Sequence, residues 1–408
     1  KNPIGQIKMN INKLKTIVRV GLQKVTAIFL PEIRVSQKFT YDLLGHEDGH
    51  YFIGYYDKDP VDHSGRYVLC HKVPFKYENM IEPRSAEIGL LSLSDNRFHQ
   101  LVTTKAMNWQ LGSRAQWLSK NIIIYNDIVK GEQCSIKFNT STKEKLFIYK
   151  RSFWDISPDK KFGASLNFSR IKVMRPGYGY NGNNTDGDKD VLTVFSLDND
   201  KLIYEIGLDE IIKTVNYENL KNEDIYLNHI VWSPCSTKLM TIFHYEDKSK
   251  GRRMIFPVLI DINTKTIDLI FEDGYFSHHT FIDKNRILAY IRLNNKYCFA
   301  IWSKDHGWIA IKDSMPELDG HPTYINSTNR ILVDSYPNRL GIMSLYLGSP
   351  DNGNKLDRIA YVVNNPKYRG PLRCDLHPRV SNKHKLIACD IPHKNGRKIL
   401  IIKGALNG

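Results

Sequence analysis

The feature that most constrains the fold is a motif that occurs seven times along the chain. Each copy contains an aromatic residue or a histidine, a short strand, a turn rich in Ser, Asp, Asn and Lys, and then an apolar strand. Examples are "WDISPDKKFGASLNF", "HPTYINSTNRILVDSY" and "HPRVSNKHKLIACD". The turns of the seven copies are marked by Ser64, Ser119, Pro158, Pro234, Asp283, Ser327 and Asn382.

The spacing of these turns suits one particular all-β architecture. Successive markers lie 55, 39, 76, 49, 44 and 55 residues apart. A four-stranded blade of a β-propeller takes ~40–50 residues, so each motif corresponds to one blade. We therefore predict a seven-bladed β-propeller; two β-sandwiches are the alternative, which explains the repeat less well. The longest gap contains a Gly- and Asn-rich segment, residues 173–190, which we expect to form a long loop on one face.

The N-terminal segment differs from the rest of the chain. Residues 1–30 contain six basic residues and no acidic one, and their apolar run at 17–30 is interrupted by Arg19, Gln23 and Lys24. This run is neither a membrane span, which needs ~18 uninterrupted apolar residues, nor a signal peptide. We expect residues 1–38 to be a basic helical extension and residues 39–408 to be the propeller. For residues 1–30, peripheral contact with a membrane and packing on the propeller both stay open, so we expect a cytoplasmic or membrane-peripheral protein.

The charge indicates the class of partner, and the cysteines exclude two kinds of structural site. The chain has 58 basic and 43 acidic residues, a net charge of +15. Such an excess favours nucleic acid, anionic lipid or acidic polysaccharide. The aromatic residues do not form an RNA-stacking motif, so we expect no nucleic-acid partner. Six scattered cysteines without a CxxC pair indicate free thiols rather than disulfides or a zinc knuckle.

Histidines recur at one position of the motif, just before or on the strand that leads into the turn. Because the loops of all blades of a propeller form a common mouth, these imidazoles can meet around one divalent ion. The alternative is that they form hydrogen bonds between blades. The histidines at this position are His50, His229, His278, His279, His321 and His377.

A second group of residues suits acid–base chemistry. Histidine titrates near neutrality, tyrosine can donate a proton, and arginine can hold a carboxylate and stabilise an enolate. Together they suit proton abstraction beside a carboxylate, followed by loss of a leaving group. The candidates are His50, His71, Arg170, Tyr180 and His229. The alternative for Arg170 and Arg175 is a solvated loop charge, and for Tyr178 and Tyr180 it is packing against Pro176.

Long stretches of the chain resemble a known family. "HYFIGYYDKDPVDHSGRYVL", "LNFSRIKVMRPGYGY" and "CDLHPRVSNKHKLIACD" are similar to blade signatures of bacterial seven-bladed propellers related to oligogalacturonate lyases and ulvan lyases. The similarity runs from about Phe39 to Ile402. It implies β-elimination on an acidic surface or capsular polysaccharide that contains uronic acid. It also implies a histidine and a tyrosine as base and acid, an arginine against the uronate carboxylate and, in some members, a divalent metal.

The resemblance assigns roles to particular residues. His50 and His71 match the two early histidines of the ulvan-lyase-like pattern, and His229 resembles the catalytic histidine of the oligogalacturonate lyases. Arg170 matches the arginine that neutralises the carboxylate, with Tyr180 as a further catalytic candidate. The expected substrate-binding residues are Tyr55, Arg175, Tyr178 and Arg373, and the expected metal ligands are His279, His321 and His377.

The last blade departs from the family's pattern. Oligogalacturonate lyases carry a Gln and a second His near the "HP" of this blade, whereas this chain reads "RCDLHPRV", with Arg373 and Arg379. Of the two metals we expect, zinc or manganese, this departure argues against manganese-type ligation, and zinc, a weaker metal site and no metal stay open. A non-catalytic propeller that binds a glycan or a protein partner, and another glycan-active enzyme, are the alternative functions.

Overall fold

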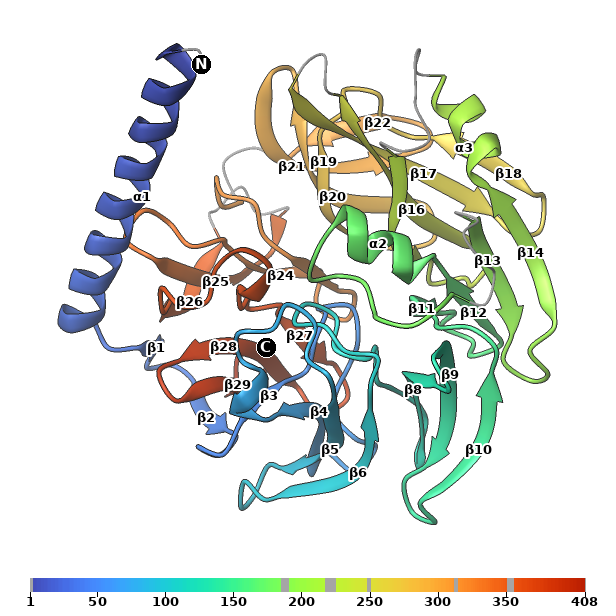
Figure 1. Cartoon of the computed structure of the whole chain (residues 1–408), viewed down its shortest axis with the longest axis horizontal. Coiled ribbons are helices and arrows are strands. Elements are labelled where there is room, and N and C mark those ends of the chain that lie inside the picture. The colour runs from blue at the N-terminus through green and yellow to red at the C-terminus, as the bar shows by residue number, and fades with distance from the viewer. Residues whose placement is uncertain are drawn as a thin grey trace.

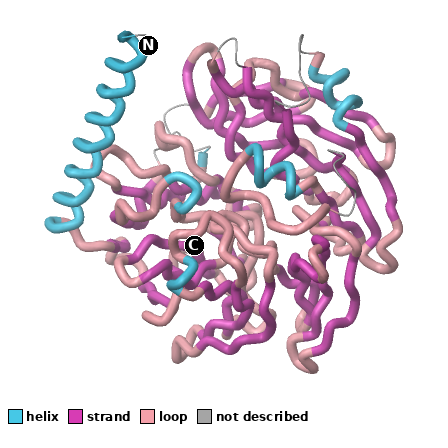
Figure 2. Tube along the Cα trace, in the orientation of Figure 1, coloured by secondary structure: helices cyan, strands magenta, loops and turns pink. Residues whose placement is uncertain are grey.

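The computed structural model describes residues 3–184, 191–216, 225–247, 251–311, 315–350 and 356–407, with the side chains of the first helix from residue 16 onward. Its strands form seven antiparallel sheets around a common axis (Figure 1), which confirms the predicted seven-bladed β-propeller. Strands and loops make up most of the fold and helices are few (Figure 2).

The first three blades follow one another along the chain. Blade 1 contains β3 (His50–Phe52), β4 (Tyr67–Val73), β5 (Ala86–Ser92) and β6 (Phe98–Thr104). Blade 2 contains β7 (Gln116–Ser119), β8 (Ile122–Val129), β9 (Glu132–Asn139) and β10 (Glu144–Tyr149). Blade 3 contains β11 (Asp155–Ile156), β12 (Phe162–Ser165), β13 (Val191–Ser196) and β14 (Leu202–Gly207).

The next two blades repeat this order. Blade 4 contains β15 (Ile225–Trp232), β16 (Lys238–Asp247), β17 (Arg252–Asp261) and β18 (Thr266–Leu269). Blade 5 contains β19 (Phe276–Phe281), β20 (Arg286–Leu293), β21 (Lys296–Ser303) and β22 (Gly307–Ala310).

The last two blades each take a strand from the N-terminal part of the chain. Blade 6 contains β23 (Pro322–Ile325), β24 (Arg330–Asp334), β25 (Ile342–Gly348), β26 (Asp357–Val363) and β1 (Ile33–Val35). Blade 7 contains β27 (Arg379–Ser381), β28 (Leu386–His393), β29 (Gly396–Lys403) and β2 (Thr40–Leu44). The first and last parts of the chain therefore share a sheet, and this pairing closes the ring. The expected boundary at residue 38 falls between β1 and β2, so the segment before it already supplies a strand to blade 6.

The hydrophobic core lies between the blades. Leu69 and Ile123 pack between blades 1 and 2, and Met240 and Phe276 between blades 4 and 5. Similar clusters fill the other five interfaces around the ring. Because the middle strands are buried on both faces, they are continuous apolar runs such as "NIIIYND" rather than alternating ones.

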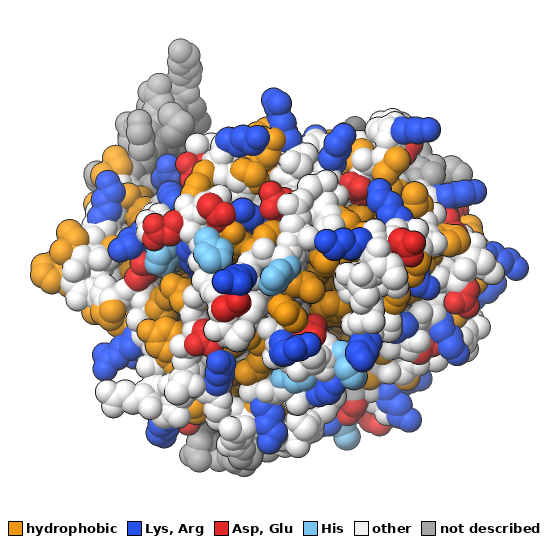
Figure 3. Space-filling view, turned by 90° about the horizontal axis from the view of Figure 1, so that it is seen from below, with side chains coloured by type: hydrophobic (Ala, Val, Ile, Leu, Met, Phe, Trp, Pro, Cys, Tyr) orange, Lys and Arg blue, Asp and Glu red, His pale blue; other side chains and the backbone are white. Residues whose placement is uncertain are grey.

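Three α-helices and the surface complete the described part of the chain. α1 (Pro3–Phe29) lies beside blade 6 and extends away from it (Figure 1), which confirms the predicted N-terminal helix. α2 (Phe168–Met174) and α3 (Leu208–Val215) flank blade 3. Residues 175–184 of the expected loop are irregular, and its residues 185–190 lie outside the described residues. None of the described helices is long and apolar enough to span a membrane. Basic and acidic side chains are interspersed over one side of the molecule (Figure 3).

Candidate functional site

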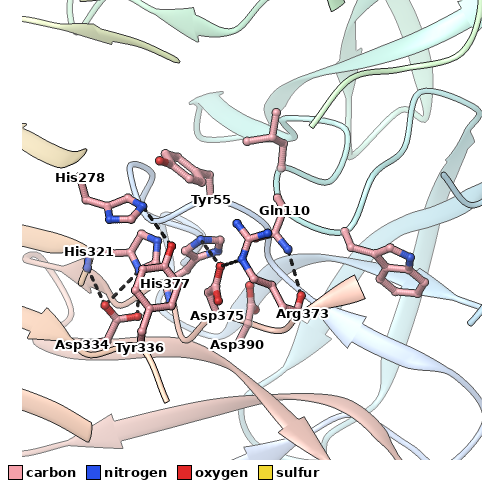
Figure 4. Close-up of polar contacts among 12 residues, drawn as sticks. Tyr55, Gln110, His278, His321, Asp334, Tyr336, Arg373, Asp375, His377 and Asp390 are labelled. Carbon is pink, nitrogen blue, oxygen red and sulfur yellow. Dashed lines mark hydrogen bonds and ion pairs between the residues drawn. The ribbon is translucent and has the colours of Figure 1, made fainter. Parts of the chain in front are cut away.

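Histidines from four successive blades meet at the propeller axis. His229 lies on β15 and His278 on β19, whereas His321 and His377 lie just before β23 and β27. The ring centroids of His278 and His321 are 4.0 Å apart, and those of His321 and His377 are 4.4 Å apart (Figure 4). The first strands of these blades contact one another, so equivalent positions in each blade converge.

Three side chains in this cluster could hold a metal ion. One ligand atom from each of His321, Asp375 and His377 lies within 4.8 Å of the other two, and all three residues are buried. Two of them are predicted ligands, but Asp375 is not. Its position two residues before His377 is the sequence signal for it, because Asp-x-His is a compact spacing for two ligands.

Hydrogen bonds from the protein orient both imidazoles. The Nδ1 atom of His321 is 3.0 Å from both carboxylate oxygens of Asp334, and the Nδ1 of His377 donates to the carbonyl of Gly54 at 2.7 Å. The Nε2 atoms of both rings are buried and have no hydrogen-bond partner in the described part of the chain. A histidine whose Nδ1 is a donor presents a free Nε2 lone pair, as metal-binding histidines do. This donor set therefore fits a divalent metal.

The pKa values of these two histidines shift in opposite directions. Burial, followed by the charge of His321, holds the pKa of His377 well below its usual value. Burial also opposes protonation of His321, but the Asp334 carboxylate outweighs it and raises the pKa of His321. His377 is therefore a neutral ligand candidate at neutral pH, and His321 is tied to its carboxylate partner.

His278 extends the cluster on the side of blade 5. Its Nδ1 is 3.1 Å from Oδ1 of Asp319, and its Nε2 is 3.4 Å from the hydroxyl of Tyr336. Burial and then the charge of His321 lower the pKa of His278, although Asp319 opposes this shift. His278 therefore lies beside the possible metal ligands with its ring fixed at both nitrogens.

His279, the predicted ligand, points in a different direction from His278. Its ring is 5.3 Å from that of Phe276, its Nδ1 is 3.2 Å from the carbonyl of Ser277, and it is not part of the group with His321. Neighbouring residues of a strand face opposite sides, and the register of β19 shifts between Phe276 and His279. Burial lowers the pKa of His279 to about 4.

His229 has an unusual backbone and side chain. Its φ is 62°, and the register of β15 shifts around it. Both ring nitrogens are buried without a hydrogen-bond partner among the described residues, and the ring lies 5.2 Å from that of Tyr55. Burial, followed by the charge of Arg175, holds its pKa well below the usual value. Strained non-glycine residues are frequent at functional sites, and a neutral imidazole can accept a proton.

Two arginines contact Tyr178, whose ring lies 5.8 Å from that of His229. The guanidinium of Arg175 lies 4.1 Å from the ring centroid of Tyr178 and has no acidic partner among the described residues. Arg373 donates to the Tyr178 hydroxyl at 2.6 Å and to Asp375 at 2.8 Å. A cavity of about 100 Å³ is lined by Tyr55, Arg175, His229, His278 and Tyr336, among others. The structure thus brings together the predicted substrate-binding residues Tyr55, Arg175, Tyr178 and Arg373.

The early histidines contact other parts of the molecule. The ring of His50 lies 5.2 Å from Trp109, and its Nδ1 accepts a hydrogen bond from the backbone of Arg397. The ring of His71 stacks on Phe52, and its Nε2 accepts from the backbone of Ser113 at 3.0 Å. Neither ring contacts the histidines at the axis in the described part of the chain, and the catalytic roles of His50 and His71 stay predictions.

Arg170 and Tyr180 also bind the backbone. The guanidinium of Arg170 donates to the carbonyl of Ile225 and ties α2 to β15. The hydroxyl of Tyr180 donates to the carbonyl of Gly112 at 2.9 Å, and its ring stacks on Phe168. In the described part of the chain, these two residues bind backbone carbonyls and do not line the cavity that contains His229.

Comparisons with known proteins agree with this fold. The chain is similar to the crystal structure of oligogalacturonate lyase from Vibrio parahaemolyticus, with a TM-score of 0.59, 11% identity, and coverage of 91% of this chain and 97% of that one. It is also similar to an oligogalacturonate lyase in complex with manganese, with a TM-score of 0.60, 13% identity, and coverage of 90% and 96%. No protein-family model and no curated protein sequence matches. At these identities the likeness shows the fold, and it confirms the predicted structural resemblance to oligogalacturonate lyase propellers.

Proposed function

We propose that this protein is a lyase that cleaves a uronic-acid-containing polysaccharide or oligosaccharide by β-elimination. The observation that supports this most strongly is that the neutral imidazole of His229 and the guanidinium of Arg175 line the same cavity, and neither has a hydrogen-bonding or acidic partner among the described residues. A base beside a carboxylate-binding cation is what proton abstraction from a uronate requires.

The reaction assigns a task to each group. Arg175 binds the uronate carboxylate, and His229 removes the proton on the adjacent carbon. The electron pair of that C–H bond forms a carbon–carbon double bond, and the C–O bond to the leaving sugar breaks. Burial and the nearby Tyr56 hydroxyl raise the pKa of Tyr55, which therefore keeps its proton and can donate it to the leaving oxygen.

His321, Asp375 and His377 are the residues that would hold a divalent ion. Such an ion would stabilise negative charge that develops on the substrate carboxylate. The similar lyase with manganese supports this proposal, and a set of two imidazoles and one carboxylate also suits zinc. Asp334 and Gly54 orient the imidazoles, and Arg373 holds the Asp375 carboxylate.

An activity screen tests the lyase proposal. The protein is incubated with oligogalacturonate, alginate, ulvan and bacterial capsular polysaccharides, with and without chelator, and ultraviolet absorbance reports the unsaturated uronate product. We expect at least one substrate to give a rise that is lost in His229→Ala and kept in His63→Ala, an exposed residue in an outer turn. His50→Ala distinguishes the two catalytic assignments, because it leaves activity intact if His229 is the base. No rise with any acidic glycan would refute the proposal.

A second role, contact with an anionic membrane surface, is favoured by α1. Its exposed apolar side chains include Ile28 and Phe29, which are 76% and 78% exposed, and Ile17, Val18, Leu22 and Val25. Residues 1–30 also carry six basic residues and no acidic one, which complements anionic lipid. The test is flotation with vesicles containing phosphatidylserine; we expect Ile28→Asp to abolish binding and neutral vesicles to bind weakly. Dimerisation without vesicle binding would refute the proposal.

A further inference from the structure

A second cavity adjoins the proposed catalytic site and reaches α1. It has a volume of about 300 Å³, and its lining includes Arg19 and Gln23 of α1 together with Tyr336, Arg373 and Asp375. Tyr336 also lines the cavity that contains His229, and Asp375 is one of the possible metal ligands. The second cavity therefore begins at the reacting centre and ends at the N-terminal helix.

α1 forms a packed wall of this cavity. A guanidinium nitrogen of Arg19 donates to the carbonyl of Pro337 at 3.2 Å, and Gln23 is only 6% exposed. The side chain of Gln23 lies so close to Gly341 that a Cβ atom there would be 2.9 Å from its Cγ atom. The helix is thus held against the turn that precedes β25, and its polar side chains face the cavity.

The lining of the cavity carries positive charge. Arg19 and Arg369 line it, and neither guanidinium forms an ion pair with a described acidic residue. The carboxylate in the lining, that of Asp375, is engaged by Arg373. Both arginines are exposed. Planar guanidinium groups bind carboxylates and sulfates through paired hydrogen bonds.

Aromatic rings and an amide complete the lining. Tyr368 is a buried residue of the lining, Tyr336 lines both cavities, and Asn364 adds an amide. Tyrosine presents an apolar face and a polar tip. A pyranose ring has apolar faces and polar edges, so this combination of aromatic, amide and cationic groups suits an acidic sugar.

We propose that α1 walls a second acid-recognising subsite, in which Arg19 and Arg369 bind an anionic group on the sugar next to the one that reacts. This inference rests on the proposed lyase function, because that function identifies which sugar of the glycan reacts and therefore which sugar is its neighbour. It makes the substrate an oligosaccharide with anionic groups on at least two neighbouring sugars, and it makes Arg19 and Arg369 determinants of specificity rather than catalytic residues.

Binding and kinetics together test this subsite. The probes are trigalacturonate, an alginate trisaccharide and a heparin tetrasaccharide, with galacturonate as the monosaccharide control. Binding to the full chain is measured by calorimetry in a His229→Ala background, which prevents turnover. We expect Arg19→Gln combined with Arg369→Gln to weaken binding of at least one oligosaccharide ten-fold or more without changing monosaccharide binding. Lys24→Gln, an exposed position of α1 outside the lining, is the matched control and leaves affinity unchanged.

The outcomes separate this inference from the lyase proposal. If the double variant loses oligosaccharide affinity but the wild type forms no unsaturated product, the subsite stands and the lyase proposal fails. If the wild type is active and the double variant keeps its KM, the subsite is overturned and the lyase proposal stands. Failure of the protein to bind any of the three oligosaccharides also overturns the subsite.

Discussion

The Nδ1 atom of His321 lies 3.0 Å from both carboxylate oxygens of Asp334, and the same carboxylate accepts a hydrogen bond from the backbone N–H of His377 at 3.2 Å. One side chain at the end of β24 therefore binds the imidazole of His321 and the backbone of His377, the two histidines that we propose as metal ligands. Because it is buried and fully engaged, Asp334 orients the His321 ring and positions the backbone that carries His377, whose ring is oriented by the carbonyl of Gly54.

Replacement of Asp334 by asparagine should weaken metal binding. We expect zinc or manganese affinity, measured by calorimetry, to fall about 10- to 100-fold, the range found when the partner of a metal-binding histidine is changed. Asparagine keeps the shape of the side chain, but it is uncharged and has one acceptor oxygen in place of two. It therefore binds the His321 ring and the His377 backbone N–H more weakly than the carboxylate does. Asp48→Asn, which alters an ion pair with Lys72, is the control and leaves affinity unchanged. Equal affinities for all three proteins would contradict the prediction.

Gly320 sets how closely the segment before His321 approaches β24. A Cβ atom at Gly320 would lie 1.8 Å from the backbone oxygen of Asp334, a contact that only movement of the backbone can relieve. Gly320→Ala should therefore lower the free energy of unfolding by about 1–3 kcal/mol or more and weaken metal binding. The control is Gly21→Ala, which adds a methyl group to open space on α1 and improves helix propensity. Urea unfolding with and without metal measures both effects, and identical midpoints for Gly320→Ala and the wild type would refute the prediction.

The fold could be predicted because the repeat encodes blades directly. A turn signal every 39 to 76 residues specifies both the strands and their number, and the equivalent blade position of His229, His321 and His377 predicts their convergence. Sequence cannot show the register shift in β19, so it could not decide between His278 and His279.

The sequence predicted Arg175 as a substrate-binding residue, but it assigned the carboxylate-neutralising role to Arg170. Arg170 and Arg175 are five residues apart at the two ends of α2, which begins after the cap Asn167 and ends before Arg175. Five residues turn a helix by about 500°, so the two side chains leave it in different directions. The position of the cap and the length of α2 decide which arginine reaches the cavity. We expected a loop from residue 173 onward and no helix here, so the sequence did not predict the directions of the two side chains.

Buried histidines should make stability depend on pH. Burial holds the pKa of His71 at about 4, although the nearby backbone of Phe52 and Ile53 opposes this shift, whereas an unfolded histidine titrates near 6.5. Between these values the unfolded chain binds a proton that the folded protein does not, so stability is full above pH ~6.5 and falls as the pH is lowered, by about 1.4 kcal/mol per pH unit for each such residue.

His71→Gln should reduce this dependence by one proton. Glutamine can still accept from the backbone of Ser113 but cannot titrate. Urea unfolding at pH 7 and pH 5 measures the slope, with His63→Gln as a control at an exposed turn. A slope that is the same in His71→Gln and the wild type would show that His71 does not contribute.

The two N-terminal strands should matter more for stability than α1. Deletion of residues 1–30 leaves β1 and β2 in place, whereas deletion of residues 1–45 exposes the edges of β26 and β29 and removes the buried side chains of Val35 and Leu44. Loss of these two side chains alone should cost about 3–6 kcal/mol, and the unpaired edges of blades 6 and 7 should promote aggregation. Thermal unfolding and light scattering compare the two deletions. Because β2 closes the ring, a 1–45 deletion as stable as the 1–30 deletion would mean that blade 7 holds together without its N-terminal strand.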